Sequence, residues 1–352
     1  MKPNKRIVEM WPYWLMYALP AFVALSDSSR ERSWPPWILL GVVFTLCIGF
    51  RYHVGGDWNN YLPYYDREIG RAFTDPISGD PGYALLNRLM AQLDWKIYGV
   101  NLICGLLFST GLIFFCRGLY RSWLGFAVAV PYLIIVVAMG YARQGVALGL
   151  IFWGLSFLEK GRFIPYMFFI AVAASFHKTA VIMIPLGIFL YRQGWLYRII
   201  AVTLVITGLW NALMEKEVDH LWNAYVEQQM YSQGAVIRVA MNAVAAFFLL
   251  KYWKLWRRVY PNALLWLWMA YAAIACIFLV GFASTAVDRI ALYLTPLQVA
   301  VFSRLPFLAQ KEYDPQTVTT WILFGYGAVL FVWLNFATHA QYWLPYRNIL
   351  FE

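Results

Sequence analysis

Three polar sites interrupt otherwise apolar sequence, and each carries a residue type that could do chemistry. Arg143 has apolar sequence on both sides, His177-Lys178 divides two short apolar runs, and Asp288-Arg289 breaks a third. A charged side chain near lipid is costly, so it usually faces a water-filled cavity and has a function there. We therefore expect these residues to lie in a polar cavity.

The residue types favour binding an anion and moving a proton. Planar guanidinium groups suit phosphate oxygens, and Arg143 stands where an apolar segment begins, so helix-end amides could add to an anion site. A histidine can take a proton from a hydroxyl near neutral pH. The full set of candidate site residues comprises Arg51, His53, Asp57, Arg143, His177, Lys178, Asp288 and Arg289.

Each candidate also has a purely structural interpretation. Arg51 could reach the membrane interface, and His177 could be a hydrogen-bonded residue of a helix turn. Asp288 and Arg289 could simply neutralise charges nearby. His53 is interpreted as a surface residue, and the same applies to the histidines outside the candidate set.

Several function classes are excluded by the motifs that the sequence lacks. The chain has no Cys/His spacing typical of a metal site, no phosphate-binding GxxxxGK[ST] loop and no GxSxG turn. These absences argue against an ATP-driven pump and a serine hydrolase, and we expect neither a metal nor another cofactor. Nothing in the pattern of positive charge indicates a nucleic-acid partner.

The composition predicts an all-α, polytopic integral membrane protein that forms one domain over residues 1–352. Hydrophobic residues make up 62% and charged residues 13% of the chain, whereas soluble domains have roughly 25% charged residues. We expect about 12 transmembrane helices. They span approximately Met10–Leu25, Trp37–Phe50, Tyr98–Cys116, Trp123–Met139, Gln144–Leu158, Phe163–Phe176, Thr179–Leu190, Ile199–Leu213, Val236–Leu250, Ala263–Phe282, Ile290–Phe302 and Val318–Phe336.

The distribution of Lys and Arg predicts the orientation. One set of 14 lies in short loops, whereas five of the other 14 lie in the long loop Arg51–Lys96. Short loops carry more topological weight, so we place the first set in the cytoplasm, with both termini and the candidate residues outside. Lys2, Lys5 and Arg6 are then exceptions. The two longer loops of the outer face cover residues 51–97 and 214–235.

Six short motifs occur in order along nearly the whole chain, and as a set they closely resemble the EpsG-like family of bacterial polysaccharide polymerases, related in role to Wzy. The motifs read Gly49-Phe50-Arg51-Tyr52-His53-Val54-Gly55-Gly56-Asp57-Trp58-Asn59-Asn60-Tyr61, Asp80-Pro81-Gly82-Tyr83, Arg143-Gln144, Phe176-His177-Lys178-Thr179-Ala180-Val181-Ile182-Met183-Ile184-Pro185, Asp288-Arg289-Ile290-Ala291-Leu292-Tyr293 and Leu344-Pro345-Tyr346-Arg347. Gly56 replaces the usual Thr, Lys178 the usual Ser, and Asp288 a usually neutral residue. None of these departures removes a candidate reactive group.

The resemblance implies a multi-pass glycosyltransferase of the bacterial inner membrane whose active site faces the periplasm or the outside. It would polymerise undecaprenyl-diphosphate-linked oligosaccharide repeat units into exopolysaccharide, capsule or O-antigen chains. A hydroxyl of one unit would attack the anomeric carbon of the growing chain, and the lipid diphosphate would leave. The expected partners are this lipid-linked oligosaccharide and the bilayer, and a chain-length regulator is a further possible partner.

Roles for individual residues follow from this reaction as hypotheses. Arg143 and Arg289 would hold the diphosphate, and His177 would be the general base or orient the acceptor. Arg51 and Asp57 would complete the site, with Asp57 as the alternative base. The residues expected to position the substrate are Tyr61, Gln144, Asp288, Tyr293 and Arg347.

Other functions remain open at this point. A ligase that hands finished polysaccharide to an acceptor would use the same arginines and histidine. A membrane acyltransferase is a weaker alternative, based on a histidine within the membrane. A transporter or flippase for lipid-linked sugars belongs to another class, and we see no internal repeat that supports it.

Overall fold

The computed structural model describes residues 3–26, 33–190, 200, 203 and 234–351 of the chain. Within these residues the regular secondary structure is helical, which confirms the predicted all-α fold, and an isolated β-bridge joins Arg51 to Asn348. The helices are α1 (Pro3–Ser26), α2 (Trp34–Gly49), α3 (Trp58–Asp66), α4 (Pro81–Gln92), α5 (Lys96–Arg117), α6 (Ser122–Ala129), η1 (Val130–Ala138), α7 (Ala142–Leu158), α8 (Phe163–Phe176), η2 (Lys178–Met183), α9 (Ile184–Leu190), α12 (Ala235–Lys251), α13 (Trp253–Val259), α14 (Ala263–Leu279), α15 (Ser284–Leu294), α16 (Pro296–Leu308), α17 (Pro315–Phe336) and η4 (Thr338–Tyr342).

The apolar helices are consistent with a polytopic membrane protein. Among the described residues, α5 and α17 are each long and apolar enough to cross a membrane. The bent pairs α12–α13 and α15–α16 raise this number to four if each pair crosses as one span, and several further apolar helices are shorter. The number of about 12 spans therefore stays a prediction. The expected span Ile199–Leu213 and the loop 214–235 lie outside the described residues, except for residues 200, 203, 234 and 235.

Small residues let the central helices pack closely. A Cβ atom on Gly111 of α5 would lie 1.9 Å from the carbonyl oxygen of Gly149 on α7, and one on Gly149 would lie 2.4 Å from the Cα of Phe108. In a membrane, helices associate through such close backbone contact rather than through the hydrophobic effect. The buried helix α7 is therefore held firmly, and it carries Arg143 at its start.

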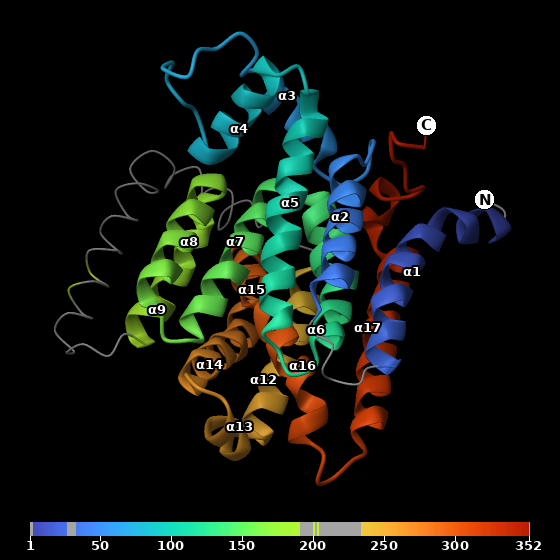
Figure 1. The fold of residues 1–352 in the computed structure, drawn as a ribbon, viewed down its shortest axis with the longest axis vertical. Coiled ribbons are helices and arrows are strands. Elements are labelled where there is room, and N and C mark those ends of the chain that lie inside the picture. Colours follow the sequence, from blue (N-terminus) through green and yellow to red (C-terminus); the bar gives the residue numbers. More distant parts are fainter. Residues whose placement is uncertain (1–2, 27–32, 191–199, 201–202, 204–233, 352) are drawn as a thin grey trace.

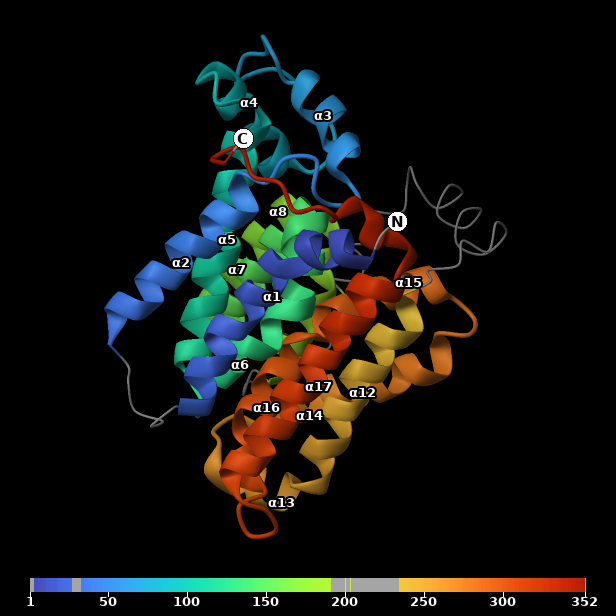
Figure 2. The same cartoon turned by 90° about the vertical axis from the view of Figure 1, so that its right-hand side faces the viewer.

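The two ends of the helix bundle differ, as Figure 1 shows. Helices α3 and α4 lie together at one end, and α13 lies at the other. The C-terminal tail crosses the first of these ends (Figure 2), where the backbone N–H of Tyr52 donates to the carbonyl of Arg347 at 3.0 Å. The first long loop and the C-terminus thus share one end, as the predicted orientation requires. Which end faces the cytoplasm stays a prediction.

The segment expected as one long loop contains the two helices α3 and α4, and a buried ion pair clamps them together. Arg88 on α4 donates to Glu68 Oε2 from Nε at 2.9 Å and from Nη2 at 2.8 Å. Its Nη1 also donates to the backbone carbonyls of Ala72 and Asp75, at 2.6 and 3.2 Å. Because Arg88 thereby closes the connection between the two helices, it fixes the start of α4, where Asp80 stands.

A π-helix precedes the break before α7. The helix η1 covers Val130–Ala138, and such helices are frequent at functional sites. The indole N–H of the buried Trp343 donates to the carbonyl of Ile135 at 2.7 Å, so the C-terminal tail satisfies a backbone acceptor of η1. The tail therefore supports the turn from which Arg143 projects.

Candidate active site

Asp80 joins three segments that are distant in the sequence. Its Oδ2 accepts a hydrogen bond from Nη1 of Arg143 at 2.9 Å and lies 3.7 Å from Nδ1 of His177. Its Oδ1 accepts from the backbone N–H of Lys178 at 3.3 Å. The side chain of Asp80 is only 7% exposed. One buried carboxylate thus positions the arginine at the start of α7 and the histidine after α8, and we call these three residues the Asp80 cluster.

Arg143 lies in the first turn of α7, where backbone N–H groups lack partners within the helix. Such a helix end attracts anions, and the charge of Arg143 adds to this effect. The guanidinium lies 4.8 Å from the ring centroid of Tyr64, 5.9 Å from that of Tyr61 and 6.0 Å from that of Tyr83. These cation–π contacts hold the group in place, while 25% of its side chain stays exposed.

His177 occupies the turn between α8 and η2, where an extended backbone ends α8. Its Nε2 lies 3.4 Å from the amide nitrogen of Gln144, and its Nδ1 faces Asp80. An amide nitrogen can only donate, so this contact favours the tautomer with hydrogen on Nδ1 and a lone pair on Nε2. The nitrogen that can accept a proton is therefore Nε2, next to Gln144.

Helix α15 brings the second arginine to the same region. The hydroxyl of Tyr293 on α15 lies 3.0 Å from Oγ1 of Thr179 on η2, and this contact ties the two helices together. Arg289 stands one turn before Tyr293, and its positive charge acts on Asp57 and on His177. Asp57 stands just before α3 and accepts from the side-chain amide of Asn60 at 3.1 Å. The two arginines and both candidate bases thus share one electrostatic environment.

Burial and charge set the protonation of the site. Burial raises the pKa of Asp57, although its bond to Asn60 and the charges of Arg143 and Arg289 act against the rise. Burial would also raise the pKa of Asp80, but the neighbouring His177 and Arg143 outweigh it and lower that pKa. For His177, burial lowers the pKa below the usual 6.5, against the opposing effect of Asp80. At neutral pH the site therefore holds an ionised Asp80 beside a neutral imidazole.

The sequence model of the EpsG family matches residues 36–348, a range that contains the whole Asp80 cluster. The chain belongs to the EpsG family. Membership suggests a polymerase-like role in polysaccharide biosynthesis. No curated protein and no solved structure matches the chain. Among the residues that the structure describes, no three His, Cys, Asp or Glu side chains form a group that could hold a metal ion.

Two of the expected site residues of this EpsG-family protein have other partners. Arg51 is fully buried, and its guanidinium donates to the backbone carbonyls of Ile48 and Val54 and to Asn101 Oδ1. It therefore caps the end of α2 instead of facing the site. Asp288 forms an ion pair with Arg238 on α12, with 2.6 Å between Oδ1 and Nη1. This arrangement favours the interpretation that Asp288 neutralises a neighbouring charge.

The remaining expected residues divide into two groups. Tyr61 and Gln144 contact members of the Asp80 cluster, and Tyr293 lies beside Thr179, close to it. Arg347 instead lies in the C-terminal tail. Its side chain is exposed, and its backbone carbonyl accepts the hydrogen bond from Tyr52.

Sequence reasoning assigned no role to four residues that shape this site: Asp80, Tyr64, Tyr83 and Arg238. Asp80 and Tyr83 lie in one of the six motifs, so the signal was present without a role attached. An acid directly before a proline that starts a helix is a typical N-terminal pattern. Arg238 lies at the start of a predicted span. A lone cation there indicates a polar cavity, as it does for Arg143.

Proposed function

We propose that this EpsG-family protein joins lipid-diphosphate-linked oligosaccharide repeat units into polysaccharide. The observation that carries the proposal is the contact of one buried carboxylate, Asp80, with both an arginine and a histidine. The arginine suits a phosphate oxygen and the histidine suits a hydroxyl proton. Transfer of a sugar from a lipid diphosphate to a hydroxyl can use both groups when they lie in one place.

The proposed step forms one bond and breaks one. A hydroxyl oxygen of the acceptor unit attacks the anomeric carbon of the donor, while the bond from that carbon to the diphosphate oxygen breaks. The hydroxyl proton passes to Nε2 of His177. The bonding electrons leave with the diphosphate, whose negative charge grows during the step.

Arg143 and Arg289 stabilise that growing charge. Preorganised donors contribute most where charge develops in the transition state, because they need no reorganisation during the reaction. Asp80 accepts a hydrogen bond from one nitrogen of Arg143. A guanidinium has five N–H donors, so Arg143 keeps donors for a phosphate. Asp57 lies beside the same charges and is proposed to orient the acceptor hydroxyl.

Among the tyrosines around Arg143, Tyr64 suits the substrate as well, whereas Tyr61 and Tyr83 position the guanidinium. Tyr61 and Tyr83 are buried against the guanidinium, and Tyr64 is half-buried at the edge of a small cleft that Arg143 and Asp80 also line. A tyrosine has an apolar ring face and a polar hydroxyl, and this combination suits a sugar ring. In this proposal the site faces the outer leaflet of the inner membrane, and the lipid carrier is undecaprenyl diphosphate.

Polymer length in cells distinguishes this proposal from its alternatives. A strain that lacks the gene would receive the wild type or the Arg143→Ala variant at equal protein level. We expect long chains from the wild type and single lipid-linked repeat units on the outer leaflet from the variant. Long lipid-linked chains in the deletion strain would instead favour a ligase. Units that remain on the inner leaflet would favour a flippase.

A further inference from the structure

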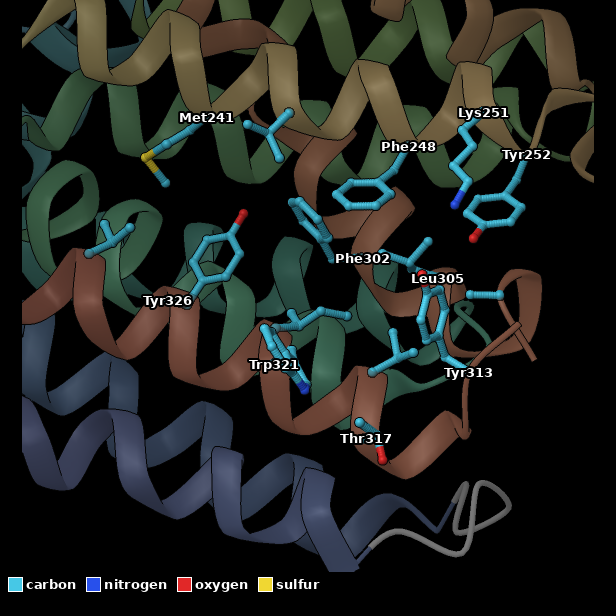
Figure 3. Close-up of a pocket in the computed structure, with 16 residues that line it drawn as sticks. Met241, Phe248, Lys251, Tyr252, Phe302, Leu305, Tyr313, Thr317, Trp321 and Tyr326 are labelled. Carbon is cyan, nitrogen blue, oxygen red and sulfur yellow. The ribbon is translucent and has the colours of Figure 1, made fainter. Parts of the chain in front are cut away.

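A large apolar groove lies between α12 and α17, with α16 along one side. Its volume is about 630 Å³, and Figure 3 shows Met241, Phe248, Phe302 and Trp321 among the side chains that line it. None of the lining residues belongs to the Asp80 cluster. Trp321 lines the groove and is 74% exposed, so the groove is open on the side of the helix bundle. In a membrane protein, an apolar groove on this side faces the lipid.

The groove has one polar end. Lys251 and Tyr252 lie together at that end, opposite Met241 (Figure 3), and Thr317 also lines the groove. Ten residues of α12 separate Met241 from Lys251, so the groove runs for about 15 Å along the helix. This shape matches an amphiphile with an apolar chain and a polar head, and matches a second apolar helix less well.

Positive charge surrounds the polar end. Lys251 pairs with Glu312 at 2.8 Å, which offsets one charge. Directly after Lys251 the chain bends by 78° into α13, which exposes further cations at the same end of the bundle. These are Lys254, Arg257 and Arg258. Together with Lys251 these cations number four, and they outnumber Glu312 and Asp314, the two acids of the connection to α17, so an anionic head group is the complementary ligand.

We propose that this groove binds one anionic phospholipid, with an acyl chain along α12 and α17 and the phosphate beside Lys251 and α13. The half-buried Trp253 of α13 suits a helix at the membrane interface. The site is separate from the proposed catalytic reaction, and the inference does not depend on it. A phospholipid fits better than the lipid-linked substrate because the polar end lies at the opposite end of α12 from Arg238, which reaches the active-site region through Asp288.

The test counts lipids that stay bound to the purified detergent-solubilised protein in native mass spectrometry. The probes are phosphatidylglycerol and phosphatidylcholine, each added to delipidated protein. Gly325→Trp places an indole in the groove, and its Cβ would meet no atom within 4 Å. Phe324→Trp is the matched control, since Phe324 is 79% exposed and does not line the groove.

We expect the wild type and Phe324→Trp to retain one phosphatidylglycerol and Gly325→Trp to lose it. Lys251→Gln should lower the preference for phosphatidylglycerol over phosphatidylcholine by about fivefold. Equal retention of the two lipids by the wild type would overturn the proposal, as would unchanged retention by Gly325→Trp. Displacement of the bound lipid by an equal concentration of undecaprenyl phosphate would assign the groove to the lipid carrier instead.

Discussion

Arg143 and Asp80 form an ion pair with 2.9 Å between Nη1 and Oδ2, although 63 residues separate them in the chain. The pair fixes the guanidinium on its buried side and leaves a quarter of the arginine side chain exposed. The same carboxylate faces Nδ1 of His177. One residue therefore contacts both the proposed anion-binding group and the proposed base.

Replacement of Arg289 tests the second diphosphate contact. Arg289→Ala should lower the rate of chain growth by about 10²–10³-fold, the usual loss when one preorganised donor is removed. The measurement is the initial rate of polymer formation at saturating substrate. Arg162→Ala is the control, because Arg162 is an exposed arginine before α8 and should leave the rate unchanged. Similar losses of rate in both variants would contradict a specific contact between Arg289 and the diphosphate.

The pH dependence of the rate reports on the contact between Asp80 and His177. Burial lowers the pKa of His177 below 6.5 and the charge of Asp80 opposes that shift. The imidazole of His177 acts as a base only when it is neutral, so the rate should fall as the pH falls through this pKa. Asp80→Asn removes the opposing charge, and the pKa of His177 should fall further. We therefore expect a lower maximal rate and an acid limb at lower pH, and an acid limb at higher pH would contradict the assignment.

The choice between His177 and Asp57 as base can be tested directly. His177→Gln should lower the rate by about 10²–10⁴-fold, the usual contribution of a general base. Asp57→Asn should lower the rate as well, because it weakens the orientation of the acceptor, but the acid limb should stay in place. If the acid limb disappears in Asp57→Asn and persists in His177→Gln, the two roles must be exchanged.

Gly55 should tolerate no side chain, whereas its neighbour should. Gly55 has a φ of +112°, and a Cβ there would lie 2.3 Å from the carbonyl oxygen of Met139. Gly55→Ala should destabilise the protein by more than about 1 kcal/mol. At Gly56 the nearest atom, in Trp343, lies 3.6 Å away, so Gly56→Ala should be neutral. Thermal unfolding in detergent measures both, and equal midpoints would show that the turn adapts.

Residues at the joints between apolar segments were the candidates that the sequence could indicate. Arg143, His177 and Arg289 have few polar neighbours along the chain, so the cost of a charge near lipid indicates a shared cavity. The sequence did not indicate the partners of Arg51. Its guanidinium binds the carbonyls of Ile48 and Val54, and the need for donors at that helix end depends on how the chain turns after α2. Sequence periodicity does not show that turn.

Asp80 shows the other limit of sequence reasoning. It lies in a polar connection where an acid is ordinary, so its residue type alone did not indicate a role. Its importance arises because the clamp between Arg88 and Glu68 brings the start of α4 over the turn that holds His177. Such a contact between distant segments is a tertiary feature. The apolar pattern could predict α5 and α17 because each is long, but α3 and α4 are short and lie in polar sequence.

A chain-length assay on purified protein tests the central claim most directly. Wild-type protein, Arg143→Ala and the control Arg162→Ala, which changes an exposed arginine next to α8, would each receive verified lipid-diphosphate-linked repeat units, with and without EDTA. We predict a ladder of products from the wild type and from Arg162→Ala, unchanged by EDTA, and none from Arg143→Ala. An equal ladder from Arg143→Ala, or no ladder from folded wild-type protein, would contradict the account.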